Sequence, residues 1–361
     1  MPKCNPIANP LKSRTMKVLF VCSGNSKNFE VVPFIKEQGD SLVRRGIQVD
    51  YYPIVGKGLP GYVKAGLQLR KHLKTHQYDL IHAHFTLSGW SAVLGANKTP
   101  VVLSLMGSDA YGEYIGVNKV KFSSRYFTLL TYLIQPFTKY IISKSANIEQ
   151  YVFLKNKSYI VPNGINKEKF KPSTQDYRTE LGLPQDKKLV LFLGNKTNVR
   201  KNYVLAKQAV DSLHRNDVEL INPFPVTHDQ IPKYLNAVDV LVVPSLMEGS
   251  PNVIKEAMAC NCPIVSTDMG DAKWVLGNTP GCYTASFQPQ NFAEKLKLSL
   301  AFAEEHGRTN GAQRIKDLGL DADTVANRIV DIYKQATHPL NSPATKTQYA
   351  APLERQQVGI T

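Results

Sequence analysis

Residues 239–267 read DVLVVPSLMEGSPNVIKEAMACNCPIVST, and this stretch decides the fold. The apolar runs 239–243 and 263–266 predict two buried strands. Between them lie a polar loop, 244–250, and a segment with the composition of a helix. A strand, a loop, a helix and a second strand in this order predict one unit of a parallel sheet that is covered by helices.

The junction between the loop and the helix predicts an anion-binding site. Ser250 is expected to cap the start of the helix, and Pro251 suits its first turn. The free N–H groups of Asn252 and Val253 would then point out of the helix start. Such N–H groups attract anions, and open α/β sheets bind ligands at the carboxyl ends of their strands. We therefore expect a phosphate group here.

Two carboxylates bracket this expected phosphate: Glu248 in the loop and Glu256 in the helix. Carboxylates accept hydrogen bonds from hydroxyl groups, so sugar hydroxyls could lie on either side of the phosphate. The alternative is an ordinary strand–loop–helix with two surface glutamates, which the spacing of the pair alone would not exclude. The loop, the proline, the helix and the second strand together favour a ligand site.

The pattern Glu248-x7-Glu256, with the flanking segments EGSPNVIKEAMAC and PIVSTDMGD, resembles the signature of retaining glycosyltransferases of family 4. The resemblance covers residues 16–336. It implies an α/β protein with the GT-B fold, in which two Rossmann-like domains with parallel sheets face each other across a cleft. It also implies that a nucleotide-sugar donor is bound by Glu248, Gly249, Ser250, Asn252, Val253 and Glu256.

The resemblance further implies a mechanism. Glu248 would hold the sugar hydroxyls and stabilise the developing cation, and Glu256 would bind the ribose hydroxyls. The sugar would leave and be attacked on the same face while the departing diphosphate is stabilised by positive groups. No D-x-D motif lies at a strand end, so neither a catalytic metal nor any other cofactor is expected; the nucleotide-sugar is a substrate.

A basic cluster in GNKTNVRKN, residues 194–202, follows another predicted strand. A diphosphate needs more positive charge than two helix-start N–H groups supply. Lys201 resembles the phosphate-binding lysine of the family, with Arg200 beside it. The family usually has an arginine where this chain has Asn195, and either Arg200 or Lys196 could substitute for it. Lysine and arginine at a helix start are otherwise ordinary solvated residues.

Gly24, His84 and Asp109 in the first half are candidates for the same cleft, the last two as catalytic residues, and Met106 departs from the family. Gly24 follows the first strand, where the family lets the backbone approach the donor or the acceptor, although the G-x-G-x-x-G motif is absent. His84 ends a strand and is expected to face the cleft; a half-buried histidine is the alternative. Asp109 is a candidate near the acceptor, with capping as an equal alternative. Met106 stands where related enzymes often carry a sugar-contacting histidine.

The length of 361 residues favours two domains. We expect a basic arm over 1–15, an acceptor domain over 16–168, a nucleotide-sugar domain over 169–336 and a mobile tail over 337–361. The linker 161–174 is rich in Asn, Gly, Pro and Lys. In the implied fold, the last helix, 322–336, crosses back to the first domain.

Strands and helices are expected to alternate in both halves. Further strands are predicted over 17–22, 49–53, 80–83, 101–105, 140–142, 159–161, 189–194 and 218–221. Helices are predicted over 29–45, 62–76, 123–137, 146–154, 203–214 and 228–237.

The positive charge is concentrated in the first half. Residues 16–168 carry 19 Lys+Arg and 9 Asp+Glu, whereas residues 169–361 carry 22 and 20. This excess suggests an anionic partner, such as an anionic membrane leaflet, although it could also simply aid solubility. The basic helix 62–76 and the aromatic-rich segment 122–139 could both rest on a leaflet, and a buried core helix is the favoured alternative for the second. No RNA-binding signature is present, so nucleic acid is the least favoured partner.

The sequence contains no apolar run long enough to span a membrane and no apolar core of a signal peptide near its start. Five cysteines without metal-ligand spacing suggest reduced thiols, so we expect a cytoplasmic protein, peripheral on the inner face of the membrane if a lipid carries the acceptor. The leading interpretation is sugar transfer to a glycan or lipid-linked acceptor in surface polysaccharide or glycoconjugate synthesis. A sugar-nucleotide epimerase of the same fold and a non-catalytic nucleotide-sugar- or polyanion-binding protein are the alternatives.

Overall fold

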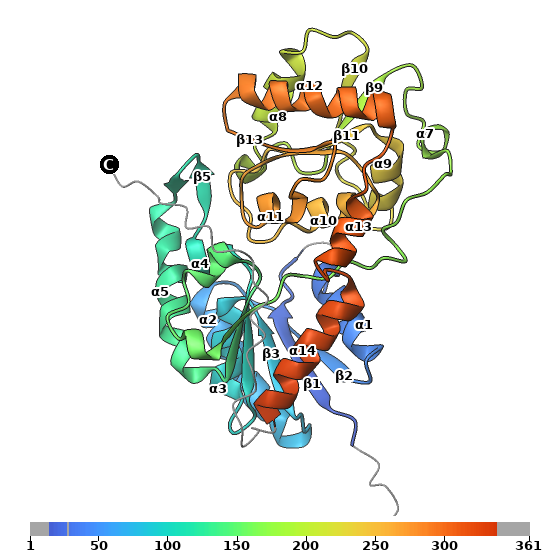
Figure 1. Ribbon diagram of the computed structural model, residues 1–361. Helices are drawn as coiled ribbons and strands as arrows, with labels where there is room; N and C mark the ends of the chain where they lie inside the picture. Colours follow the sequence, from blue (N-terminus) through green and yellow to red (C-terminus); the bar gives the residue numbers. More distant parts are fainter. Residues whose placement is uncertain (1–13, 27–28, 338–361) are drawn as a thin grey trace, which may run out of the picture.

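The computed structural model describes residues 14–26 and 29–337. The predicted arm and tail therefore lie almost wholly outside the described residues. Two parallel sheets, one in each half of the chain, make up the frame (Figure 1). The first has the order β2-β1-β3-β4-β7-β8 and the second the order β10-β9-β11-β12-β13. A small antiparallel hairpin, β5–β6, stands apart from both sheets.

The strands of the first sheet are β1 (Lys17–Ser23), β2 (Gln48–Ile54), β3 (Leu80–His84), β4 (Val101–Leu105), β7 (Tyr140–Ser143) and β8 (Ser158–Ile160). Those of the second are β9 (Lys188–Phe192), β10 (Val218–Ile221), β11 (Val240–Val243), β12 (Ile264–Thr267) and β13 (Cys282–Ala285). The hairpin pairs β5 (Tyr114–Gly116) with β6 (Lys119–Val120).

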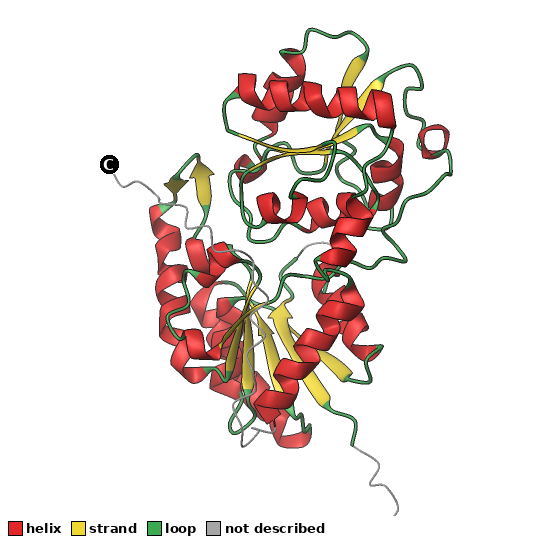
Figure 2. Cartoon of the chain, in the orientation of Figure 1, coloured by secondary structure: helices red, strands yellow, loops and turns green. Residues whose placement is uncertain are grey.

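Helices cover both faces of each sheet (Figure 2). In the first half, one face carries α2 (Gly58–Thr75), α3 (Thr86–Gly95) and α5 (Arg125–Ile134), and the other carries α1 (Pro33–Val43) and α14 (Ala322–Thr337). In the second half, one face carries α9 (Ile231–Ala237), α10 (Asn252–Ala259), α11 (Ala272–Leu276) and α13 (Gly311–Asp317), and the other carries α8 (Tyr203–Asp211) and α12 (Pro289–His306). Short helices α4 (Ser108–Tyr111), α6 (Ala146–Glu149) and α7 (Tyr177–Glu180) lie in the connections.

The strands read as continuous apolar runs because both of their faces are buried. In β1, Leu19 and Val21 join the core beneath α2 and α3, while Val18 and Phe20 join the core beneath α1 and α14. The last helix, α14, belongs to the first sheet although it follows the second in sequence. Its buried Tyr333 hydroxyl lies 2.6 Å from Nδ1 of His82 in β3.

Several elements differ from those predicted. Helix α3 was missed because its Thr and Ser residues look like a loop; in the structure they are buried, and Ser91 donates to the carbonyl of Tyr62 at 2.7 Å. The helix predicted over 146–154 ends at Glu149, since Gln135 Oε1 accepts the backbone N–H groups of Phe153 and Leu154. The helix predicted over 29–45 begins only at Pro33.

Candidate active site

In each sheet the strand order reverses at one point, between β1 and β3 in the first and between β9 and β11 in the second. Loops that leave the carboxyl ends of strands at such points are where open α/β sheets bind ligands. Gly24 follows β1 and His84 ends β3, while Lys201 follows β9 and Glu248 follows β11. The candidates from both halves therefore lie at the expected edges.

The loop that carries Glu248 touches the first half of the chain. The side-chain amide of Asn147 donates to the carbonyl oxygen of Glu248 at 3.2 Å. A Cβ atom on Gly249 would lie 2.9 Å from the carbonyl oxygen of Met106. Glycine at 249 therefore allows the two halves to approach closely at this point.

Glu248 pairs with both cations of the predicted cluster. Lys201 Nζ lies 2.7 Å from Oε1, and the Arg200 guanidinium contacts Oε2. The carboxylate side chain is only 13% exposed. Burial acts to raise the pKa of Glu248, but Lys201 and Arg200 outweigh it and hold the pKa below its ordinary value. Glu248 is thus a carboxylate anion. An anionic ligand that enters the site would compete with it for Lys201 and Arg200.

The backbone ties these two loops together. Arg200 and Lys201 lie in a short 3-10 helix, η4 (Val199–Lys201), in which the Asn198 side chain accepts the N–H of Arg200 at 3.1 Å. The carbonyl of Arg200 in turn accepts the N–H of Leu246 at 2.8 Å. Lys196, the other candidate, lies instead over the ring of Tyr203. The structure therefore brings Arg200 and Lys201, and not Lys196, onto Glu248.

Ser250 is not the cap that the sequence predicted. Helix α10 begins at Asn252, with Pro251 in the capping position and no side-chain cap. The hydroxyl of Ser250 donates to Asp271 and accepts from Lys255 Nζ at 2.8 Å. Because Lys255 and Asp271 are both buried, their charges need a bridging partner, and Ser250 supplies it. Burial lowers the pKa of Lys255 and raises that of Asp271.

This buried bridge was missed by sequence reasoning. The one signal was a lysine among the apolar positions of the helix, in the segment NVIKEAMA. Lys255 also donates to the carbonyl of Asn163 in the linker, at 3.2 Å. The bridge therefore fixes the start of α10 against both the following loop and the linker.

Gly270 packs against the backbone of the loop that carries Glu248, and its replacement gives a first prediction. Its φ is +62°, and an added Cβ would lie 2.6 Å from the carbonyl oxygen of Gly249 and 2.7 Å from that of Glu248. Gly182 has the same φ of +62° but nothing within 4 Å of an added Cβ. Gly270→Ala should therefore lower the free energy of unfolding by about 1–3 kcal/mol more than Gly182→Ala, as measured by urea denaturation. Equal losses would show that the collision with the loop is absent.

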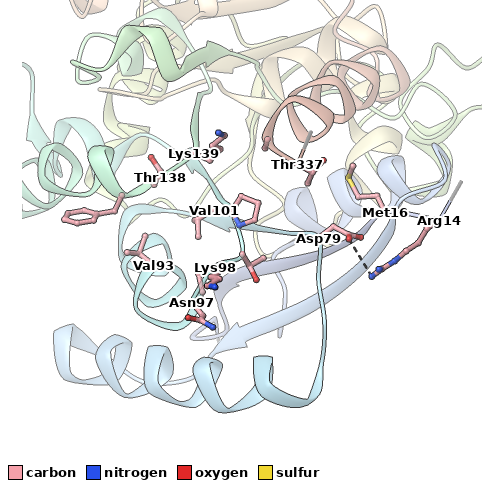
Figure 3. Close-up of a pocket in the computed structure, with 15 residues that line it drawn as sticks. Arg14, Met16, Asp79, Val93, Asn97, Lys98, Val101, Thr138, Lys139 and Thr337 are labelled. Carbon is pink, nitrogen blue, oxygen red and sulfur yellow. Dashed lines mark ion pairs between the residues drawn. The ribbon is translucent and has the colours of Figure 1, made fainter. Parts of the chain in front are cut away.

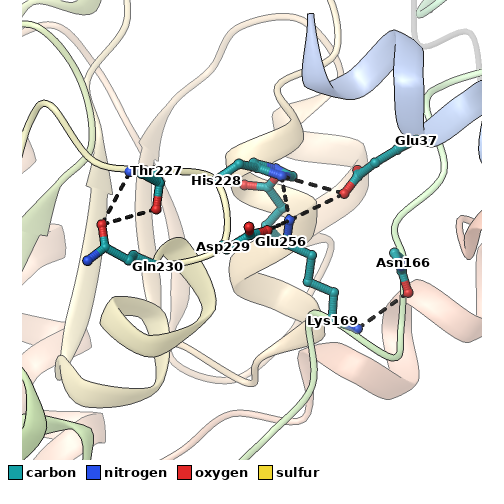
Figure 4. Close-up of polar contacts among 8 residues, drawn as sticks. All are labelled: Glu37, Asn166, Lys169, Thr227, His228, Asp229, Gln230 and Glu256. Atoms are coloured by element: carbon teal, nitrogen blue, oxygen red, sulfur yellow. Dashed lines mark hydrogen bonds and ion pairs between the residues drawn. The ribbon is translucent and has the colours of Figure 1, made fainter.

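Glu256 lies in a polar cluster that joins both halves (Figure 4). His228 Nε2 is 3.2 Å from Glu256 Oε1, and its Nδ1 is 2.7 Å from Lys169 Nζ. Glu37 of α1 lies 3.5 Å from Nδ1 of His228. Lys169 also binds Asp229 at 2.7 Å. The expected ribose-binding carboxylate is thus held by a histidine that no motif had indicated.

The charge of His228 gives a second prediction. The bond with Glu256 raises the pKa of His228 against the opposing effects of burial and Lys169, and Glu37 adds to the rise. A raised pKa means that the folded protein binds the proton more tightly. The stability that the folded protein gains from protonated His228 is fully present below the ordinary pKa of 6.5. It is lost as the pH rises through the pKa of His228 in the folded protein.

We therefore expect the difference in free energy of unfolding between the wild type and His228→Gln to be larger at about pH 5.5 than at about pH 8.5. The control is His306→Gln, since His306 is an exposed histidine beside Glu305. A difference for His228→Gln that is independent of pH, or that grows with pH, would contradict the prediction.

The first-half candidates take up different roles. The backbone N–H of Gly24 donates to the carbonyl of Ile54 at 2.8 Å, and an added Cβ would lie 2.9 Å from Pro53. His84 does not face open space, because the residue is 1% exposed and its ring packs at tilted angles against Phe20 and His82 beneath α1 and α14. Burial, and secondarily Lys144, holds the pKa of His84 well below its ordinary value.

Asp109 is wholly buried, and its side chain accepts hydrogen bonds from the backbone around it. Its carboxylate accepts the N–H groups of Met106 at 3.0 Å, Gly107 at 2.8 Å and Thr86 at 3.1 Å. It therefore ties the loop after β4 to the start of α3. Asp109 is not itself the N-cap of α4, which is Gly107, but its hydrogen bonds position Met106 and Gly107 opposite Gly249.

A cavity of 1120 Å³ lies elsewhere, at the amino ends of the first sheet's strands (Figure 3). It is lined by Met16 before β1, Asp79 before β3 and Lys139 before β7. Arg14, which also lines it, lies 3.6 Å from Asp79. Because it opens at the edge opposite to Glu248, it is separate from the candidate active site.

Within the described residues, no group of three or more His, Cys, Asp and Glu side chains is arranged to hold a metal ion. The same part of the chain contains no helix with the length and apolar character needed to cross a membrane. The four described cysteines, Cys22, Cys260, Cys262 and Cys282, are free and buried.

Two family profiles match the chain. Residues 7–169 match the family described as "Glycosyltransferase Family 4", and residues 186–301 match "Glycosyl transferases group 1".

Three curated relatives show the same likeness. The chain is 27% identical to the putative teichuronic acid biosynthesis glycosyltransferase TuaC of Bacillus subtilis, over 65% of this chain and 66% of the relative. It is 25% identical to the D-inositol 3-phosphate glycosyltransferase of Xylanimonas cellulosilytica, over 82% and 83%. It is 23% identical to the UDP-Gal:alpha-D-GlcNAc-diphosphoundecaprenol alpha-1,3-galactosyltransferase of Escherichia coli, over 60% and 64%.

Solved structures share the architecture. Sucrose-phosphate synthase of Thermosynechococcus elongatus superposes with a TM-score of 0.71 and 18% identity, over 89% of this chain and 99% of that chain. Anabaena HepE, solved with UDP and glucose, superposes with a TM-score of 0.63 and 18% identity, over 88% and 98%. These likenesses confirm the GT-B fold.

Proposed function

Because the chain is a glycosyltransferase of the family 4 type, we propose that it transfers a sugar, with retention of configuration, from a nucleotide-sugar donor to a glycan or lipid-linked acceptor. We place this reaction in surface polysaccharide or glycoconjugate synthesis, as the printed names of the Bacillus and Escherichia relatives suggest. One observation carries the proposal: Arg200 and Lys201 converge on the buried carboxylate of Glu248 at the point where the second sheet reverses its strand order.

The donor is proposed to bind with its diphosphate at Arg200 and Lys201. Two cations facing one carboxylate leave a net positive charge, which suits a doubly charged diphosphate. The sugar would lie beside Glu248 and Gly249, and the ribose hydroxyls beside Glu256. The HepE structures with UDP and with UDP-glucose support a uridine nucleotide as the first donor to test.

The proposed transfer follows from these charges. As the bond from the anomeric carbon to the diphosphate breaks, negative charge grows on the leaving oxygen and positive charge on the sugar ring. Arg200 and Lys201 would stabilise the first, and the Glu248 anion the second. Since two side chains supply the positive charge, we propose that no metal ion and no other cofactor is required.

The acceptor is proposed to enter beside the close contact of Gly249 with the Met106–Gly107 turn, where the two halves meet. A lipid-linked acceptor would place the enzyme in the cytoplasm, at the inner face of the membrane. Nucleic acid is not proposed as a binding partner.

The test has two stages. Thermal shift with UDP-, GDP-, ADP- and TDP-sugars and the free nucleotides is expected to select one nucleotide, since ligands that bind the folded form raise Tm. The selected donor is then incubated with and without candidate acceptors. Transfer that requires an acceptor supports the proposal. Turnover of the donor alone would support an epimerase, and no Tm shift with any nucleotide would overturn the donor site.

A further inference from the structure

Helix α5 carries an apolar stripe that faces away from the core. Phe122, Tyr126, Leu129, Leu133 and Phe137 recur at intervals of three or four residues and so share one side of the helical segment. Phe122 is 83% exposed, Phe137 61% and Leu129 58%. We propose that this stripe, here termed the α5 face, rests on the surface of an anionic lipid bilayer.

The helix buries its other side. Thr131 and Ile134 are wholly buried, and Thr131 bonds to the carbonyl of Asp109 at 2.7 Å. Helix α5 stands on the outer flank of the first half (Figure 1). The orientation of the helix is therefore fixed by its inner side, and the outward stripe of large apolar residues is left for another surface.

The charges around the α5 face fit anionic headgroups. Lys119, Lys121, Arg125 and Lys139 are exposed and flank the stripe. Between Glu113 and Glu149 the chain has five lysines and arginines and no Asp or Glu. Aromatic and aliphatic side chains with a basic border are the pattern by which helices lie in the interface of an anionic bilayer.

The second segment that the sequence offered is less suited. In α2, Leu59, Val63 and Leu67 are also exposed, but its one aromatic residue, Tyr62, is buried in the core beneath the first sheet, so α2 presents no aromatic side chain to a bilayer interface. The segment 122–139 was expected to be a buried core helix. In the structure one of its sides is buried, and the other side is the exposed α5 face. Of the two sequence candidates, the α5 face therefore has the more aromatic exposed side, with Phe122 and Phe137 as its most exposed residues.

The α5 face adjoins the candidate active site. The hairpin β5–β6 leads directly into η1 (Phe122–Ser124) at the start of the face, and β5 contacts η4, which carries Arg200 and Lys201. Delivery of a lipid-linked acceptor from the bilayer to this site rests on the proposed function. Binding of the bilayer itself does not.

The experiment is flotation of the purified full chain with vesicles of phosphatidylglycerol and phosphatidylcholine, and with phosphatidylcholine alone. The wild type should float with the anionic vesicles, and Leu129→Glu/Leu133→Glu should reduce the bound fraction on the order of tenfold, because it places charge in the apolar stripe. The matched control is Val204→Glu/Leu298→Glu, which alters two exposed apolar residues of the second half.

The outcomes decide the proposal. An unchanged Tm and unchanged nucleotide binding in Leu129→Glu/Leu133→Glu, together with lost flotation, support it. Equal flotation of both double variants, or no flotation of the wild type, overturns it. If the wild type is instead a dimer in solution that Leu129→Glu/Leu133→Glu separates, the α5 face is a subunit interface and the bilayer is rejected.

Discussion

Glu248→Gln is expected to lower kcat by about 10²–10³-fold while nucleotide affinity stays the same or increases. Glutamine keeps the shape of the side chain but removes the anion that would stabilise the positive charge on the sugar ring. It also frees Lys201 and Arg200 from a competing partner, since both now contact the Glu248 carboxylate. The measurements are initial rates at saturating donor and calorimetric Kd for the nucleoside diphosphate.

The matched control is Glu219→Gln, which alters a glutamate in β10 of the same sheet that pairs with Lys187 at 3.1 Å and is 39% exposed. It should change neither quantity. Loss of the Glu248 charge leaves two cations without their partner, so Tm without nucleotide is followed as well. A kcat within about threefold of the wild type would exclude Glu248 from the chemistry.

Lys201→Ala is expected to move nucleotide affinity in the opposite direction. Its ammonium is proposed to bind the diphosphate, and hydrogen bonds to charged groups contribute about 1.5–3 kcal/mol each. We therefore expect the Kd for the nucleoside diphosphate to rise about 10–150-fold, and the double variant with Arg200→Ala to bind more weakly still.

Lys207→Ala is the control for this prediction, because Lys207 lies in the following helix, pairs with Asp211 and is 59% exposed. Calorimetry with the same nucleotide measures all three variants. If Lys201→Ala and Glu248→Gln changed affinity in the same direction, the cations would serve only to hold Glu248, and the proposed diphosphate site would be wrong.

Most of the frame could be read from the sequence. Buried parallel strands appear as apolar runs, and polar loops follow them, so β1, β4, β10 and β11 were predicted within about one residue at each end. The carboxyl ends of parallel strands gather at one edge. The loops that carry Lys201 and Glu248 were therefore expected together, and the structure joins them at 2.7 Å.

Other features depended on contacts between distant segments. Ser250 had the local sequence of a helix cap, yet its hydroxyl forms hydrogen bonds with the buried Lys255 and Asp271 instead. His84 looked like a cleft residue, but α1 and α14 cover its face of the sheet. His228 lies 28 positions from Glu256, and nothing in the spacing indicates their bond.

The sequence was sufficient for the two parallel sheets and for placing the Glu248 loop and the basic cluster at the carboxyl ends of strands in the second half. Hydrophobic periodicity and strand polarity are local properties, and they place chain segments without knowledge of their neighbours. The outward side of α5, the histidine that contacts Glu256 and the partners of Ser250 could be seen only in the folded chain. Those outcomes depend on which buried charge or apolar surface arrives from elsewhere in the chain, because burial makes each polar group take the partner that is within reach.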